Sequence, residues 1–121
     1  MINETRKILH KQDLKITATC VRVPVLNCHC ESINLELENN FDIKDIYTTL
    51  ANFKNITVLD KPDENLYPLP TLVSGKDNVF VGRIRRDYSI ENGLNLWVVA
   101  DNIRKGAATN AIQILEKLIY N

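Results

Sequence analysis

Residues 79–100 read VFVGRIRRDYSIENGLNLWVVA, and this stretch decides the fold. Two runs rich in β-branched residues, 79–86 and 94–100, flank a turn-like connection at 87–93. That connection ends on Asn92-Gly93, a pair that favours the left-handed backbone of tight hairpin turns. The stretch therefore predicts two antiparallel strands joined as a hairpin.

Three more segments upstream of this hairpin carry strand patterns. Residues 15–25 alternate, with Arg22 predicted on a strand face that otherwise holds apolar or small side chains. Residues 29–38 alternate between an apolar side, which includes His29, and a polar side. Residues 56–59 are typical of a short further strand.

Helical patterns lie between and after these strands. Residues 42–53 repeat apolar positions with helical spacing, and Asp42 is suited to cap the N-terminus. Residues 102–119 show a second amphipathic pattern, with Asp101 near its N-cap. Residues 4–10 are typical of the last turns of a helix, so the chain is expected to begin as if cut from a longer protein.

The order of these elements predicts an α+β fold, a mostly antiparallel sheet with helices packed on one face. Residues 60–76 contain three of the four prolines and are predicted to form a long irregular connection. Connections of this length often take part in function or in interfaces.

Length and composition set further bounds. The 121 residues fit one domain, 1–121, and 45% hydrophobic residues can build a core. Fifteen basic and fifteen acidic residues balance, which argues against nucleic acid or an anionic membrane as the main partner. The sequence contains no apolar run of about 18 residues, so no membrane span is predicted. Three cysteines between positions 20 and 30 do not form a secreted disulfide framework, so we expect reduced thiols and a cytoplasmic location.

Arg22 and His29 are the candidates for chemistry. A guanidinium on a buried strand face needs an anion, and an internal ion pair with Glu31 is at least as good an explanation as a bound carboxylate or phosphate. His29 lies seven residues later, so a hairpin would bring both side chains to one end of the sheet. Histidine suits acid–base chemistry, although a lone histidine at a strand start is more often a structural hydrogen-bonding group.

The remaining motifs favour structural explanations. Cys28 and Cys30 should face away from the His29 ring, so small buried side chains explain them better than a zinc site, and no metal site is predicted. The basic strand end at 82–87 fits a solvated or interface edge better than a phosphate or RNA site. Gly106 and the two alanines after it allow close approach of another element or a cofactor.

Three blocks in order make the chain resemble the C-terminal portion of bacterial aspartate-semialdehyde dehydrogenases. They are ITATCVRVPV followed by a histidine and ES, then VFVGRIRRD, then NGLNLWVVADNIRKGAATNAIQI. The resemblance covers nearly the whole chain. It implies a fold like the C-terminal domain of glyceraldehyde-3-phosphate-dehydrogenase-like enzymes, which in this family is the catalytic and dimerisation domain.

The resemblance also implies a reaction and residue roles. Enzymes of this family carry out NADPH-dependent reductive dephosphorylation of 4-aspartyl phosphate to L-aspartate 4-semialdehyde, which feeds lysine, methionine, threonine and isoleucine synthesis. A cysteine nucleophile forms a thioacyl intermediate before hydride transfer. By resemblance, Arg22 binds the substrate carboxylate, His29 is the general acid–base, and Asn102 approaches the NADP cofactor. A homodimer is the expected state.

The same resemblance implies that essential parts are absent. The N-terminal NADP-binding domain with its nucleophile is missing, and none of the three cysteines matches the nucleophile's position. Cys28 and Cys30 stand where the family usually has Gly and Ser. We therefore expect an inactive isolated chain, partnered by a separately supplied cofactor domain, with apolar surface exposed. The alternatives are a stand-alone dimerising or regulatory module that lost catalysis, and, more weakly, a zinc-binding interaction domain.

Overall fold

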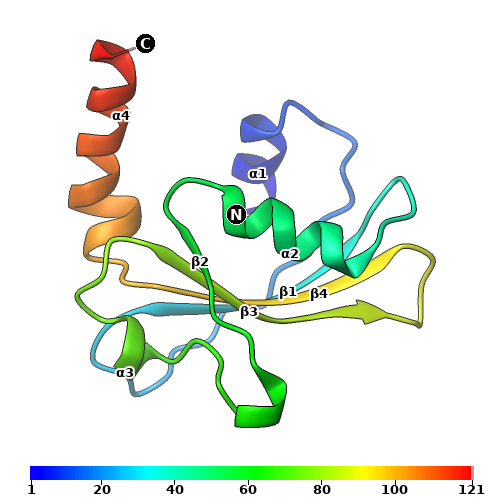
Figure 1. The fold of residues 1–121 in the computed structure, drawn as a ribbon. Coiled ribbons are helices and arrows are strands. Elements are labelled where there is room, and N and C mark those ends of the chain that lie inside the picture. Colours follow the sequence, from blue (N-terminus) through cyan, green and yellow to red (C-terminus); the bar gives the residue numbers. More distant parts are fainter. Residues whose placement is uncertain (121) are drawn as a thin grey trace.

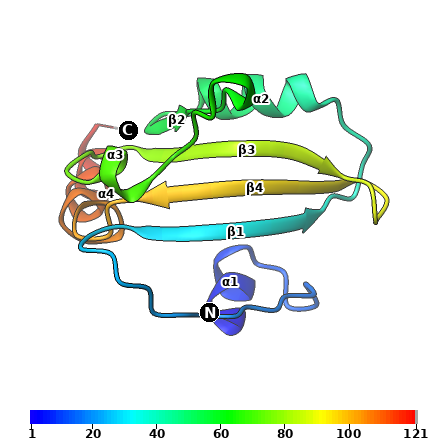
Figure 2. The same ribbon diagram turned by 90° about the horizontal axis from the view of Figure 1, so that it is seen from below.

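The computed structural model describes residues 1–120, and a four-stranded sheet lies at its centre (Figures 1 and 2). The strand order is β1-β4-β3-β2. The bounds are β1 His29–Glu36, β2 Ile56–Val58, β3 Val79–Asp87 and β4 Gly93–Ala100. The predicted hairpin is confirmed, because β3 and β4 pair antiparallel from Phe80 opposite Val99 to Asp87 opposite Gly93. β1 also pairs antiparallel with β4, and only β2 runs parallel to its neighbour.

Helices lie on both faces of this sheet. Within residues 1–120 the α-helices are α1 Ile2–Ile8, α2 Ile43–Asn52, α3 Pro70–Val73 and α4 Thr109–Ile119, and a short 3-10 helix spans Pro62–Glu64. Figure 1 shows α2 on one face and α3 on the other, while α4 rises from one end of the sheet. The predicted α+β class with a mostly antiparallel sheet is confirmed. The short helix α3 on the opposite face was not predicted, since the prolines of residues 60–76 indicated only an irregular connection.

Each face of the sheet has its own apolar cluster. On one face Val81, Ile84 and Leu94 are buried, and α2 packs its apolar stripe against them. On the other face Val73 of α3 packs with Cys28, Phe80 and Val99. Alternate residues of β3 and β4 contribute to the two clusters, as the period of a strand requires. The Asp42 cap of α2 is confirmed, because its Oδ1 accepts a hydrogen bond from the Lys44 amide at 2.9 Å.

The predicted strand at 15–25 is wrong. This segment has no regular secondary structure, and it runs outside β1 without pairing (Figure 2). A strand needs a neighbour to complete its hydrogen-bond ladder, and alternation within one segment cannot supply that neighbour. The segment is instead exposed along most of its length, including Arg22.

The last helix begins later than predicted. Asp101 caps only a short turn, and an irregular elbow, Arg104–Ala108, separates that turn from α4. Gly106 within the elbow has φ 87°, a left-handed value that a helix cannot accommodate. The apolar side chains of α4 are exposed, among them Leu118 at 77%. Within residues 1–120, no helix combines the length and apolar character needed to cross a membrane.

Candidate functional site

His29 and Asn102 come together at one end of the sheet. His29 is the first residue of β1 and pairs with Ala100, the last residue of β4. Asn102 follows two residues later, in the turn that leads to the elbow. The His29 side chain is exposed, whereas Asn102 is half-buried. The antiparallel pairing of β1 with β4 therefore places both candidates at the same sheet end, as Figure 2 shows for the strands that carry them.

Arg22 lies in the extended segment that leads to this end of the sheet. It is exposed, so the buried guanidinium that the strand prediction implied is wrong. No salt bridge joins Arg22 to Glu31, which removes the internal ion pair considered for it. The structure gives Arg22 no hydrogen bond or salt bridge to either His29 or Asn102 among residues 1–120.

The two cysteines beside His29 are directed into the protein, as expected. Cys28 is 5% exposed and lies in the cluster with Val73, and Cys30 packs against that cluster. Burial, then the nearby charges of Asp101 and Cys30, raises the pKa of the Cys28 thiol, and burial also raises the pKa of Cys30. Both are therefore weak nucleophiles. Within residues 1–120, no group of three or more His, Cys, Asp or Glu side chains is placed to hold a metal ion.

Asp101, next to Asn102, is the one buried charged side chain in the described part of the chain, with 4% of its surface exposed. Its Oδ2 accepts a hydrogen bond from the Gly75 amide at 2.7 Å, and its Oδ1 accepts one from the Ile103 amide at 3.0 Å. These bonds, that from Gly75 above all, hold the pKa of Asp101 below its ordinary value despite burial. The sequence indicated Asp101 only as a helix cap and gave no signal of its bond to Gly75.

The elbow after Asn102 is fixed by a second carboxylate. Asp77 accepts hydrogen bonds from Arg104 at 2.8 and 3.0 Å and from the Thr109 hydroxyl at 2.7 Å. The Arg104 guanidinium, followed by the Thr109 hydroxyl, lowers the pKa of Asp77 to about 2. Gly106 has no atom within 4 Å of the position that a Cβ would occupy. Asp77 thus holds both ends of the elbow in place, while Gly106 leaves an open surface between them.

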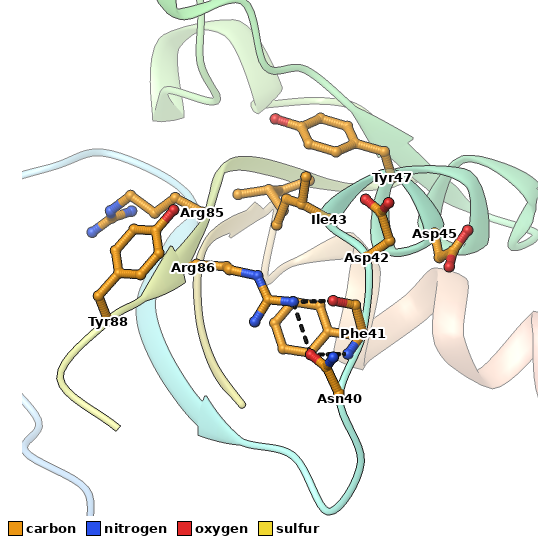
Figure 3. Close-up of a pocket in the computed structure, with 10 residues that line it drawn as sticks. Asn40, Phe41, Asp42, Ile43, Asp45, Tyr47, Arg85, Arg86 and Tyr88 are labelled. Atoms are coloured by element: carbon orange, nitrogen blue, oxygen red, sulfur yellow. Dashed lines mark hydrogen bonds between the residues drawn. The ribbon is translucent and has the colours of Figure 1, made fainter. Parts of the chain in front are cut away.

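A large cavity lies at the other end of the sheet. It measures about 800 Å³ and lies between the start of α2 and the end of β3 (Figure 3). Two of its polar side chains, Arg86 and Tyr47, already serve the fold. Arg86 stacks on the Phe41 ring at 4.1 Å and donates to the Phe41 carbonyl. Tyr47 donates to Asp60 at 2.5 Å, and burial together with this bond raises the pKa of Tyr47 to about 12. None of the three predicted site residues lines this cavity.

A basic patch occupies the sheet face that carries α3. A bulge at Arg83, where φ is 54°, breaks the pairing of β3 with β4 between Gly82 and Arg85. Arg83 lies over the Tyr67 ring at 5.4 Å, and Arg83, Arg85 and Trp97 line a cavity of about 300 Å³. Both arginines are exposed, and neither forms a salt bridge among residues 1–120. The solvated basic edge predicted for 82–87 matches this exposure.

Comparison with known proteins identifies the family. The profile of the semialdehyde dehydrogenase dimerisation domain matches residues 1–105. The chain therefore belongs to the semialdehyde dehydrogenase dimerisation-domain family. Within it, the chain is 52% identical over 119 residues to the aspartate-semialdehyde dehydrogenase of Aquifex aeolicus and 48% identical to that of Bacillus subtilis. These alignments cover 98% of this chain but only 35% and 34% of the relatives.

Solved structures agree with this assignment. Aspartate semialdehyde dehydrogenase II of Vibrio cholerae, in complex with ASA, matches all of this chain at a TM-score of 0.91 and 42% identity, over 35% of its own length. The enzyme of Candida albicans with NADP matches 68% of this chain at a TM-score of 0.56 and 30% identity, over 27% of its own length. The chain thus corresponds to the dimerisation domain of aspartate-semialdehyde dehydrogenase and spans about a third of its relatives.

Proposed function

We propose that this chain forms the substrate-binding and dimerisation part of an enzyme that makes L-aspartate 4-semialdehyde from 4-aspartyl phosphate with NADPH. The observation that carries the proposal is the shared sheet end of His29 and Asn102, in a chain 52% identical to an aspartate-semialdehyde dehydrogenase. The neighbour from Vibrio cholerae, whose complex contains ASA, supports the substrate class. Residues 1–121 would form one domain, and a separate NADP-binding domain would complete the enzyme.

In this proposal Arg22 and His29 act on the substrate. Arg22 is exposed, so its planar guanidinium can form two parallel hydrogen bonds with the substrate carboxylate. His29 is exposed at the start of β1, and its imidazole can accept a proton from the attacking thiol and return one later in the reaction. The thiol itself would come from the cofactor-binding domain, because Cys28 is buried in a cluster, Cys30 packs against that cluster, and by resemblance exposed Cys20 does not match the nucleophile's position.

Asn102 would face the cofactor. NADPH, when bound, supplies the hydride. The residues fit a planar ring in one respect: Gly106, Ala107 and Ala108 are exposed, and Gly106 has open space around it. Asn102 is half-buried next to this surface, so its amide can hydrogen-bond a polar group of the ring while its backbone stays fixed. The Candida albicans neighbour, solved with NADP, supports this choice of cofactor.

A homodimer and a cytoplasmic location complete the proposal. The basic patch of Arg83 and Arg85 lies on the sheet face that carries α3, where a second copy could cover it. The membership in a dimerisation-domain family supports this pairing. The three cysteines are free thiols, which fits a reducing compartment.

An NADPH-coupled assay tests the proposal. The chain is assayed alone and mixed with a separately produced cofactor-binding domain of an aspartate-semialdehyde dehydrogenase. Activity is expected only in the mixture, and His29→Ala should lower kcat by about 10²- to 10⁴-fold, the usual contribution of a general acid–base. His10→Ala, an exposed histidine outside the site, is the matched control and should keep full activity.

Normal turnover by His29→Ala or Arg22→Ala in an active mixture would refute the residue roles. Silence from a mixture of folded partners would instead favour a stand-alone dimerising or regulatory module. Sedimentation of the isolated chain then separates that alternative, because such a module should self-associate tightly without binding a substrate analogue.

A further inference from the structure

We propose that residues 70–75, helix α3 with the two residues after it, act as a bracket that holds His29 and Asn102 in a fixed relation. The inference deepens the proposed function and rests on it for the meaning of the two residues. The bracket contacts the chain just before His29 and again just before Asn102. Figures 1 and 2 show α3 at the end of the sheet where β1 begins and β4 ends.

The first set of contacts fixes the approach to His29. Asn27 donates a hydrogen bond to the Ser74 hydroxyl at 3.0 Å, and the Cys28 thiol lies 3.7 Å from the Pro70 carbonyl. Cys28 has φ 80°, a left-handed conformation that residues other than glycine rarely adopt. Such a conformation persists where the surrounding contacts impose it. The bracket supplies several of those contacts and so sets the direction in which β1, and with it His29, begins.

The second set of contacts fixes the turn that contains Asn102. Asp101 uses one carboxylate oxygen for the Gly75 amide of the bracket and the other for the Ile103 amide beyond Asn102. One buried carboxylate therefore joins the Gly75 amide of the bracket to the peptide that follows Asn102. Only an ionised carboxylate offers an acceptor at both positions, since an asparagine presents an NH₂ group to one of the two donors.

The bracket is itself seated firmly on the sheet. Val73 is fully buried and packs with Cys28, Phe80 and Val99. Trp97 of β4 also donates to the Pro68 carbonyl at 2.8 Å, just before the bracket. A change at Asp101 should thus be transmitted through residues 70–75 to His29. Asp77 instead binds Arg104 and Thr109, and it takes part in none of the hydrogen bonds that join the bracket to residues 27, 28 and 101.

NMR of the isolated chain tests this inference with Asp101→Asn, and with Asp77→Asn as the matched control. The signals followed are the Asn102 side-chain amide, the Gly75 backbone amide and the His29 ring. Asp101→Asn is expected to shift all three, while Asp77→Asn should leave the His29 ring signals in place. Ser74→Ala tests the same bracket from the other side and should shift the His29 ring and the Gly75 amide.

Kinetics in the mixture with the cofactor-binding domain give the second readout. Misplacement of a reacting group by about 1 Å can cost about 10²-fold, so Asp101→Asn should lower kcat by about ten- to a hundredfold and raise the KM for NADPH. A folded Asp101→Asn protein with unchanged His29 signals would overturn the inference. If Asp101→Asn does not fold, unchanged His29 signals in the Ser74→Ala protein would overturn it instead. A silent wild-type mixture would count against the proposed function alone, because the NMR coupling is measured without turnover.

Discussion

Replacing Gly82 with alanine should destabilise the fold through a clash with the connection that passes over β3. A Cβ at Gly82 would lie 2.4 Å from the Leu59 carbonyl oxygen and 2.5 Å from Cδ of Pro68. One of these is a backbone atom and the other belongs to a rigid ring, so neither can move aside alone. Overpacking of this kind costs about 1–3 kcal/mol, and we expect about 2–3 kcal/mol here because both contacts are closer than any normal Cβ contact.

The single tryptophan reports on this site directly. Trp97 lies opposite Gly82 in the β3–β4 pairing and donates its indole hydrogen bond to Pro68. Urea unfolding followed by Trp97 fluorescence, at one fixed protein concentration because the chain is expected to dimerise, should give the loss in free energy. For a domain of this size the loss corresponds to a Tm lower by about 8–12 °C.

Gly106→Ala is the matched control for this prediction. Gly106 has φ 87° but open space around it, so an added methyl group strains the backbone without a clash. That strain costs about 1 kcal/mol, part of which is offset by the lower entropy of the unfolded chain. A Gly82→Ala protein within about 0.5 kcal/mol of the wild type, or no less stable than Gly106→Ala, would refute the reasoning.

Two further outcomes follow from charge and burial. The Arg104 and Thr109 contacts lower the pKa of Asp77 to about 2 in the folded protein, whereas its pKa in the unfolded chain is about 4. The ionised Asp77 therefore stabilises the fold fully at pH values above about 4, and this contribution is lost as the pH falls towards 2. Wild type and Asp77→Asn should therefore converge in urea titrations between pH 5 and about pH 2; a constant difference would contradict this. With a thiol reagent, exposed Cys20 should react rapidly, half-buried Cys30 more slowly and buried Cys28 only on unfolding, and three equal rates would contradict this order of burial.

Local sequence patterns predicted the elements whose stability depends on their own residues. Asn92-Gly93 and its flanking runs predicted the hairpin, and Asp42 with its apolar spacing predicted α2. The same patterns failed for residues 15–25, where alternation was present but no neighbouring strand completed the ladder. They also failed at Gly106, where the backbone leaves the helical conformation and delays α4.

The candidate site shows the same division. The sequence by itself determined the identity of Arg22, His29 and Asn102 as residues of interest, through their chemistry and their resemblance to a family. Only the tertiary structure decided that His29 and Asn102 share a sheet end, that Arg22 is exposed, and that Asp101 is bonded to Gly75. The physical reason is that turns and caps are set by neighbours along the chain, whereas strand pairing and the burial of a carboxylate depend on segments distant in sequence.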